Sequence, residues 1–389
     1  MTDKFINQCR IVVTPLSPIH IGSGEDLIPT NYYMDNGVIH IFDPFKLNLP
    51  EDKRDQLLKL AQKDSFWGVY RFFYNHQDLL RHSEISVIPV DREIEDKYQE
   101  ILKNSESDNK CQISRTSVTS IHGYEQPYIP GSSLKGALHT AILYHFSDPD
   151  YNYRKNKKNI DFDKELLGAE SFAKSPMRFL KVSDLMPAKS VYSRVIKSVR
   201  ERKQNQENNG AAKKGQRTFI PSYVEIIDKA QYRAFEGTIS FISSEKSSVN
   251  HSKCIDNSRQ ISECMQDFYY DNIYEFIQGD ENWFKLFEDL ENALESEFDS
   301  GKCFIARFGK YQGMESVTLD VIDHVKTFTR AKEISRRGLI EDLPFGLALV
   351  EIDPVGENKA LKDYCECCRA SMKDFKLKDV REKLFQGKV

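Results

Sequence analysis

A short turn near the middle of the sequence carries residues well suited to holding an anion. Pro130 and Gly131 break the chain, and Ser132 and Ser133 follow at positions that favour helix capping. Lys135 falls in the first turn of the expected helix, where the helix dipole disfavours a cation unless an anion is bound beside it. The pattern predicts a phosphate site at this helix start. The competing interpretation is a capped core helix with Lys135 in solvent.

Two glycine-rich segments could also approach a phosphate backbone closely. The first, residues 20–24, joins a histidine to two glycines and a serine. The second, residues 307–313, offers Lys310 to a phosphate and Tyr311 for stacking on a base. Plain turns between strands are the alternative interpretation of both segments.

Strands and helices in mixed order are expected to position these segments. Residues 5–13 are predicted to form a first strand, and an apolar stripe at helical spacing follows Ser132. Further strands are predicted at 38–42, 177–184, 191–199, 217–227, 232–242, 303–308 and 345–352. Helices are predicted at 51–63 and 263–298, and the aromatic-rich stretch 66–74 is assigned to the core.

Composition narrows the class of protein. A chain of 389 residues is long enough for two domains or one elaborated double unit. No apolar run approaches the roughly 20 residues that a bilayer crossing needs, so no membrane association is expected. The eight cysteines lack the spacing of a secreted scaffold, which predicts reduced thiols and a cytoplasmic location. The C-x-x-C motif at 365–368 has no second pair, so no zinc site and no cofactor are predicted.

Charge is spread unevenly along the chain, although the net charge is only −4. Residues 194–217 hold eight basic and two acidic side chains, whereas residues 263–299 hold twelve acidic side chains and one lysine. One face could therefore attract phosphates while another repels them. The polar, basic loop at about 200–217 is predicted to be a flap that orders on RNA.

Signals for an enzyme are weak. The segment 131–138 has the glycine spacing of a Walker A loop but lacks its Lys-Ser/Thr pair. The sequence has no His-Asp dipeptide, no two-His helix motif and no nucleophile elbow. The catalytic alternative is metal-independent RNA cleavage, with His20 as general base on a 2′-hydroxyl and Lys135 holding the phosphate. The prediction is that the protein is not an enzyme.

The anion-binding segments also carry a family resemblance. The stretch Y-I-P-G-S-S-L-K-G-A-L-H-T-A at 128–141 resembles the signature of the RAMP superfamily, whose members bind CRISPR RNA (crRNA). Residues 18–24 and 307–313 support this resemblance. Their order and the chain length are similar to those of the RAMP subunit that caps the type III-A CRISPR–Csm effector complex near the 3′ end of the crRNA.

The resemblance implies an α+β fold of two ferredoxin-like (RRM-like) RAMP halves with helical and loop insertions. Residues 1–242 would form the N-terminal RAMP domain with the basic flap, and residues 243–389 a RAMP-like domain with the acidic helical insertion and the glycine-rich loop. The implied partners are crRNA, target RNA in the assembled complex, neighbouring Csm backbone RAMP subunits and a host nuclease that trims the 3′ end. The residues expected to contact RNA are His20, Gly22, Ser23, Gly24, Ser132, Ser133, Lys135, Arg178, Arg194, Lys213, Lys214, Arg217, Arg307, Lys310, Tyr311 and Gln312.

Overall fold

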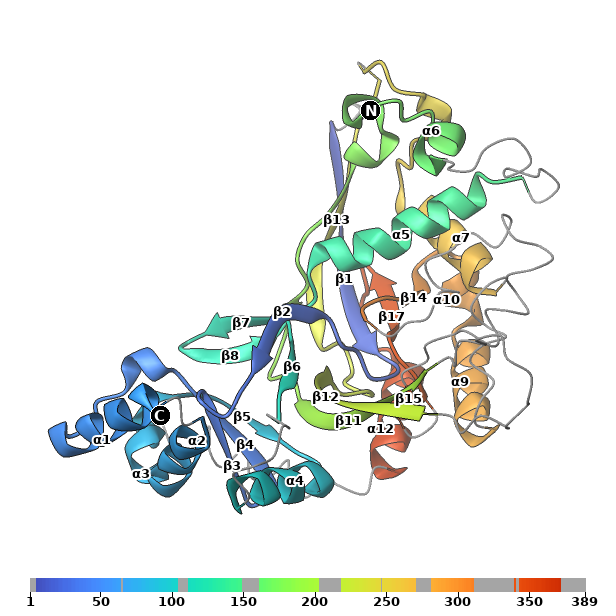
Figure 1. The fold of residues 1–389 in the computed structure, drawn as a ribbon. Helices are drawn as coiled ribbons and strands as arrows, with labels where there is room; N and C mark the ends of the chain where they lie inside the picture. The colour runs from blue at the N-terminus through green and yellow to red at the C-terminus, as the bar shows by residue number, and fades with distance from the viewer. Residues whose placement is uncertain are drawn as a thin grey trace, which may run out of the picture.

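The computed structural model describes residues 5–63, 66–103, 111–148, 161–202, 218–245, 247–270, 281–310, 339–340 and 343–371. Its helices and strands form an elongated molecule in which α1 to α4 gather at the end opposite α6 (Figure 1). Among the helices in these ranges, none combines the length and the apolar character needed to cross a membrane.

A six-stranded antiparallel sheet is built around β1 (Ile6–Pro15). β1 pairs with β13 (Phe235–Ile242) on one side and with β17 (Leu347–Ile352) on the other. β9 (Leu180–Val182) and β10 (Met186–Pro187) pair with the far edge of β13, and β14 (Cys303–Arg307) pairs with β17. β1 is buried over its last five residues because both of its edges and one face are covered.

Two helices complete a ferredoxin-like unit on this sheet. α5 (Gly131–His145) and α7 (Ser258–Phe268) pack against each other and share one hydrophobic core with β1. The order β1, α5, β9–β10, β13, α7, β17 is the β-α-β-β-α-β order of ferredoxin-like folds. The predicted α+β class and the apolar stripe on α5 are therefore confirmed. The expected domain limits stay a prediction, and this sheet pairs strands from both sides of residue 242.

A second sheet crosses the end of the first (Figure 1). Its strands, in spatial order, are β16 (Leu343–Pro344), β15 (Leu339–Ile340), β11 (Ser193–Arg202), β12 (Thr218–Ile227), β6 (Ile113–Thr116) and β2 (Gly22–Leu27). Ile19 and Ile227 exchange two backbone hydrogen bonds of 3.0 and 2.8 Å, which join β12 to the segment that follows β1. The chain therefore passes from the first sheet into the second through residues 16–21.

The remaining elements extend this body on both sides. The first group lies beyond β2 and comprises β3 (Tyr32–Asp35), β4 (Val38–Phe42), β5 (Glu84–Pro89), α1 (Glu51–Gln62), α2 (Phe66–Asn75), α3 (Gln77–Leu80) and α4 (Arg92–Lys103). The others are the hairpin β7 (Val118–Ile121) and β8 (Tyr124–Pro127), and the helices α6 (Phe162–Leu167), α9 (Glu281–Ala293), α10 (Glu295–Asp299) and α12 (Lys359–Ser371). Tyr70, Phe72 and Phe73 of α2 are buried, as expected for a core stretch, whereas Phe66 at its start is 54% exposed.

Two predicted elements have different limits in the structure. The strand expected at 177–184 is shortened, because Pro176 starts a single 3₁₀ turn through Arg178 and β9 begins only at Leu180. The single helix expected at 263–298 is divided: α7 begins at Ser258, and α9 ends at Ala293 before α10 starts at Glu295. Asn257 caps α7 by accepting a hydrogen bond from the Gln260 N–H. That cap lies upstream of the helix start predicted from the sequence.

Candidate nucleic-acid interface

The glycine-rich segments from the two ends of the chain meet in the structure. The backbone N–H of Lys310 donates a 2.7 Å hydrogen bond to the carbonyl oxygen of His20. Gly309 has φ +96°, and a Cβ there would lie 2.7 Å from the same oxygen, so a glycine is needed for this approach. A Cβ on Gly22 would lie 3.9 Å from Cδ of Lys310, which places the exposed lysine beside the exposed glycine. These loops form one surface.

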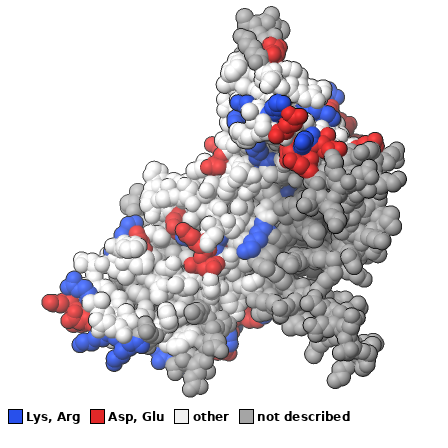
Figure 2. Space-filling model, turned by 45° about the horizontal axis from the view of Figure 1, so that its top comes forward, with Lys and Arg blue, Asp and Glu red and all other residues white. Residues whose placement is uncertain are grey.

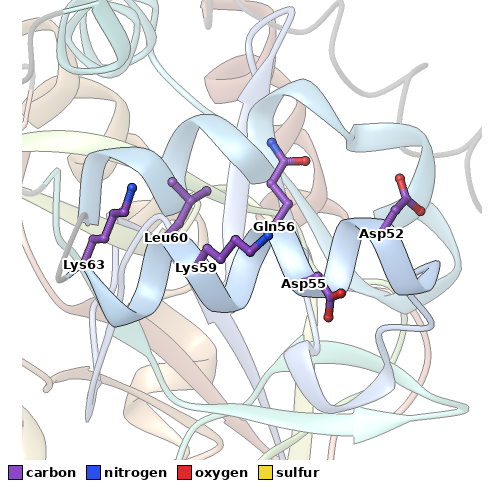
Figure 3. A pocket seen from close by; sticks show the side chains of 6 residues that line it. All are labelled: Asp52, Asp55, Gln56, Lys59, Leu60 and Lys63. Carbon is purple, nitrogen blue, oxygen red and sulfur yellow. The ribbon is translucent and has the colours of Figure 1, made fainter.

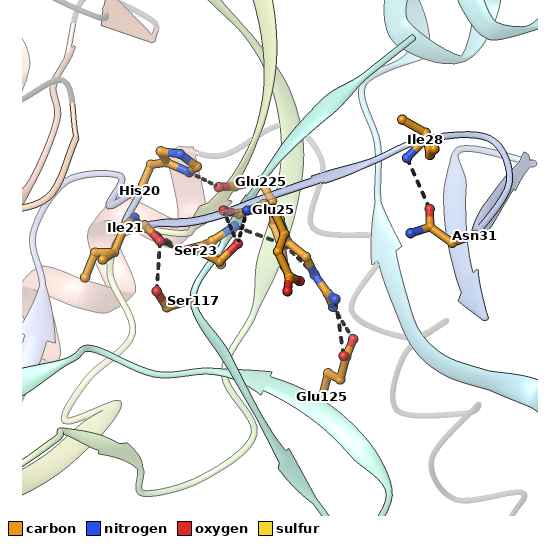
Figure 4. A network of polar contacts seen from close by, with 11 residues as sticks. His20, Ile21, Ser23, Glu25, Ile28, Asn31, Ser117, Glu125 and Glu225 are labelled. Atoms are coloured by element: carbon orange, nitrogen blue, oxygen red, sulfur yellow. Dashed lines mark hydrogen bonds and ion pairs between the residues drawn. The ribbon is translucent and has the colours of Figure 1, made fainter. Parts of the chain in front are cut away.

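Strand β6 and Ser117, the residue after it, form hydrogen bonds with the 20–24 loop (Figure 4). Ile21 donates its N–H to the Thr116 hydroxyl at 3.3 Å, and the carbonyl of Ile21 accepts the Ser117 N–H at 2.7 Å. The Ser23 hydroxyl donates to the carbonyl of Arg115 at 3.3 Å. Gly22, Ser23 and Gly24 nevertheless stay exposed, so this loop lies at a solvent-accessible surface.

A buried ion network supports the same loop and was not predicted from the sequence. The guanidinium of Arg115 binds both carboxylate oxygens of Glu125 and lies 3.7 Å from an oxygen of Glu225. Arg115 and Glu225 are 6% and 1% exposed. Burial raises the pKa of the Glu225 carboxyl, and the charge of Arg115 opposes that shift. Arg115 thus ties β6 to β8 and β12.

His20 is oriented by Glu225 through the backbone. Its Nδ1 lies 2.7 Å from the Glu225 carbonyl oxygen, and a carbonyl can only accept, so Nδ1 carries the proton and donates. The His20 side chain is completely buried. The ring therefore fixes the loop to β12 from inside the molecule.

The carboxylate of Asp184 lies at the start of α5. Asp184 accepts a 2.8 Å hydrogen bond from the N–H of Gly131. The ammonium of Lys135 donates to the carbonyl oxygens of Met177 and Leu180 at 2.9 and 2.8 Å. Burial lowers the pKa of Lys135, and repulsion from Lys181 lowers it further. These contacts explain a cation in the first turn without a bound phosphate, and a phosphate contact at Ser132, Ser133 and Lys135 stays a prediction.

Replacing Lys135 by methionine is therefore expected to lower the free energy of unfolding by about 1–3 kcal/mol, because two carbonyl oxygens would lose their donor. Urea unfolding followed by circular dichroism measures this loss. Lys59→Met on the exposed face of α1 is the control, and we expect it to change stability by less than about 0.5 kcal/mol. Equal stability of the two variants would contradict a structural role for Lys135.

Comparisons with known proteins identify the family of this chain. The model of the RAMP superfamily matches residues 12–296, which is most of the chain. The chain belongs to the RAMP superfamily. It is also 26% identical over 186 residues to the CRISPR system Cms protein Csm5 of Methanocaldococcus jannaschii. That match covers 43% of this chain and 40% of the curated relative, so it spans less than half of the relative's length.

One solved structure shares the fold of this chain at a TM-score above 0.5. A chain of a Csm–crRNA–target RNA ternary complex from a type III-A CRISPR-Cas system, determined by cryo-electron microscopy, superposes with a TM-score of 0.53 at 18% identity. The superposition covers 89% of this chain and 100% of that one. The crystal structure of Csm5 from T. onnurineus has a TM-score of 0.48 at 18% identity, covering 87% and 99% of the two chains.

The remaining residues predicted to bind RNA have other contacts, are buried, or lie outside the described ranges. Arg178 donates to the Ala173 carbonyl at 2.8 Å, and Arg194 forms a 3.2 Å ion pair with Asp228. Arg307 is 3% exposed and donates to a backbone carbonyl, so its burial does not favour an RNA contact. Five predicted residues lie outside the described residues: Lys213, Lys214, Arg217, Tyr311 and Gln312.

Two other surfaces of the described residues carry both positive and negative side chains. Lys and Arg are interspersed with Asp and Glu among the described residues on the face drawn in Figure 2. A hollow on α1 is lined by side chains of that helix alone, which are Asp52, Asp55, Gln56, Lys59, Leu60 and Lys63 (Figure 3). Its two lysines are matched by two aspartates, so the hollow presents no net positive charge to a phosphate strand. We therefore assign the candidate interface to the loops at 20–24 and 307–310.

Proposed function

We propose that this chain is a crRNA-binding subunit of a type III-A CRISPR (Csm) complex, which it caps near the 3′ end of the crRNA. Membership of the RAMP superfamily and the similarity to a Csm5 protein support this proposal. The subunit would act in antiviral defence by supporting complex assembly and crRNA maturation in the cytoplasm. Its partners would be crRNA, target RNA in the assembled complex and neighbouring Csm backbone RAMP subunits. A host nuclease that trims the 3′ end would be a further partner.

The observation that carries the proposal is the hydrogen bond from Lys310 to His20. It places the exposed residue Lys310 beside the loop of the exposed residues Gly22, Ser23 and Gly24, and the Lys310 side chain lies close to Gly22. Backbone amides, hydroxyls and lysines bind phosphate and sugar oxygens without reading the bases. A subunit built in this way accepts a crRNA of any sequence. Specificity then comes from pairing between the guide and its target.

The proposed role is binding without cleavage. A general base must come within hydrogen-bonding distance of the 2′-hydroxyl from which it takes a proton. The imidazole of His20 is completely buried and its Nδ1 donates to the Glu225 carbonyl. The proposal therefore expects a labelled crRNA precursor to stay intact with the purified chain in the absence of metal. Cleavage that disappears in a His20→Ala variant would instead support the endoribonuclease alternative.

The test of the proposed interface is the Lys310→Ala variant. Loss of one phosphate contact to single-stranded RNA should lower the slope of log affinity against log salt by about 0.7, for every guide sequence tested. Fluorescence anisotropy of a labelled crRNA over a salt series measures this slope. Lys302→Ala removes an exposed lysine at the other end of β14 and is the matched control, with an expected slope equal to that of the wild type. An unchanged slope for Lys310→Ala would remove the proposed contact.

A further inference from the structure

The turn between β12 and β13 is strained. Ala230 and Arg233 have φ values of +59° and +46°, which non-glycine residues rarely adopt. Such conformations cost about 1–3 kcal/mol each and are concentrated at ligand-binding sites. The turn keeps this shape because Ala230 donates its N–H to the Pro15 carbonyl and Arg233 donates its N–H to the Thr14 hydroxyl, both at 2.8 Å. The end of β1 therefore fixes the turn firmly.

Cations converge on this turn from three parts of the chain. The ammonium of Lys189 and the guanidinium of Arg233 lie 5.7 and 5.1 Å from the ring centre of Tyr232. Arg369 of α12 donates its Nε hydrogen to the Ala230 carbonyl at 2.8 Å. The Tyr232 hydroxyl is also fixed, because it accepts the N–H of Asn358 at 2.9 Å. The Tyr232 ring is thus held in place next to Lys189 and Arg233.

Among the described residues, the ion pairs at this turn neutralise one of these cations, Arg233. Glu351 binds Arg233 through two hydrogen bonds of 2.8 Å. Within the described residues, no carboxylate lies within ion-pair distance of Lys189 or Arg369. These two groups repel each other: burial and the charge of Arg369 both lower the pKa of Lys189. Two like charges held together gain stability when an anion binds between them.

We propose that Lys189 and Arg369 form a second phosphate-binding site, which takes a phosphodiester group of a bound RNA strand beside Tyr232. Lys189 is exposed and Arg369 is half-buried, so both can be reached from solvent. The Nε hydrogen of Arg369 is used by Ala230, which leaves the Nη groups of its guanidinium to donate to phosphate oxygens. The Tyr232 ring could pack against a ribose or a base.

The position of this site favours RNA over an acidic protein segment as the ligand. β12 lies between the two sites. His20 bonds to the Glu225 carbonyl and Ile19 pairs with Ile227 of β12, and the turn that follows β12 is the one that Arg369 contacts. A strand that passes the 20–24 loop can therefore continue along the end of β12 to Lys189. This second site rests on the proposed function and extends its RNA path.

The experiment compares the full-length wild type with Lys189→Ala and with the double variant Lys189→Ala/Arg369→Ala. A labelled single-stranded RNA is titrated over a salt series. We expect the salt slope to fall by about 0.7 for the single variant and about 1.4 for the double variant, with affinity at low salt about tenfold lower for the double variant. Arg54→Ala/Lys59→Ala removes the same charge from α1 and should leave the slope unchanged. Inorganic phosphate at constant ionic strength should compete more weakly for the variants than for the wild type.

Outcomes separate this site from the proposed function. A wild-type slope for Lys189→Ala and for the double variant, together with a lowered slope for Lys310→Ala, would overturn the second site and leave the proposed function standing. Wild-type slopes for all three would overturn both the second site and the proposed contact at Lys310. If the double variant unfolds, Lys189→Glu replaces it, since this side chain is exposed. We expect Lys189→Glu to weaken RNA binding more than Lys189→Ala does, and equal binding by the two would overturn the site.

Discussion

Replacing Arg115 by methionine is expected to lower the free energy of unfolding by about 3–5 kcal/mol at neutral pH. The substitution leaves the Glu225 carboxylate buried without its counter-charge and removes the ion pair to Glu125. Burial already raises the pKa of Glu225, and Arg115 is the largest group that opposes the shift. The variant should therefore raise that pKa further. Denaturant unfolding of the two proteins at neutral pH measures the difference.

The pH dependence of this loss has a definite sign. A carboxyl group whose pKa is raised by folding binds more protons in the folded state, so stability falls as pH rises above its ordinary pKa of 4.5. The deficit of Arg115→Met should thus be largest at neutral pH and shrink on acidification towards that value. The control is the triple variant Arg115→Met/Glu125→Gln/Glu225→Gln, which removes the stranded charges and should recover part of the loss. A deficit independent of pH would contradict the assignment of the loss to Glu225.

The second large effect is expected for Gly309→Ala. Alanine at φ +96° is strained, and its Cβ would approach the His20 carbonyl oxygen to 2.7 Å. That oxygen cannot retreat easily because it accepts the Lys310 N–H. We expect a loss of about 3 kcal/mol in stability and a larger fall in RNA affinity than Lys310→Ala causes. Thermal melting and anisotropy titration measure the two effects.

Two other glycines separate strain from contact in that experiment. Gly24 has φ +85° with open space around its Cβ position, so alanine there should cost only about 1 kcal/mol. Gly136 lies inside α5 with no neighbour near its Cβ position, so alanine should stabilise the helix by about 0.5–1 kcal/mol. A Gly309→Ala variant that behaves like Gly24→Ala would mean that the two loops do not depend on each other.

The sequence predicted those elements that depend on neighbouring residues in the chain. The breaker at Pro130 and the apolar stripe after it gave α5, and the dense aromatic run gave the buried face of α2. The two glycine loops meet in the structure, and glycines that permit close approach leave a visible pattern in the sequence; RNA binding by these loops stays a prediction. The meeting of those loops is consistent with the family resemblance carried by the same residues.

Long-range contacts account for what the sequence did not predict. The sequence suggests a phosphate ligand at Lys135, but in the structure its ammonium donates to the carbonyl oxygens of Met177 and Leu180. Asp184, which accepts the Gly131 N–H, is more than fifty residues away in the sequence. Arg115 meets Glu225 because β6 pairs with β12, and it meets Glu125 on β8, which belongs to another sheet. The Ser/Thr-rich stretch at 114–120 was the available signal, since its hydroxyls bind the 20–24 loop.

The most direct test of RNA binding by these loops is ultraviolet crosslinking of crRNA in the assembled complex, followed by mass spectrometry of the linked peptides. We expect RNA-linked peptides to contain residues 18–24 and 307–310, because those segments meet at one exposed surface. Crosslinks confined to α1 to α4, with none at either loop, would contradict the account.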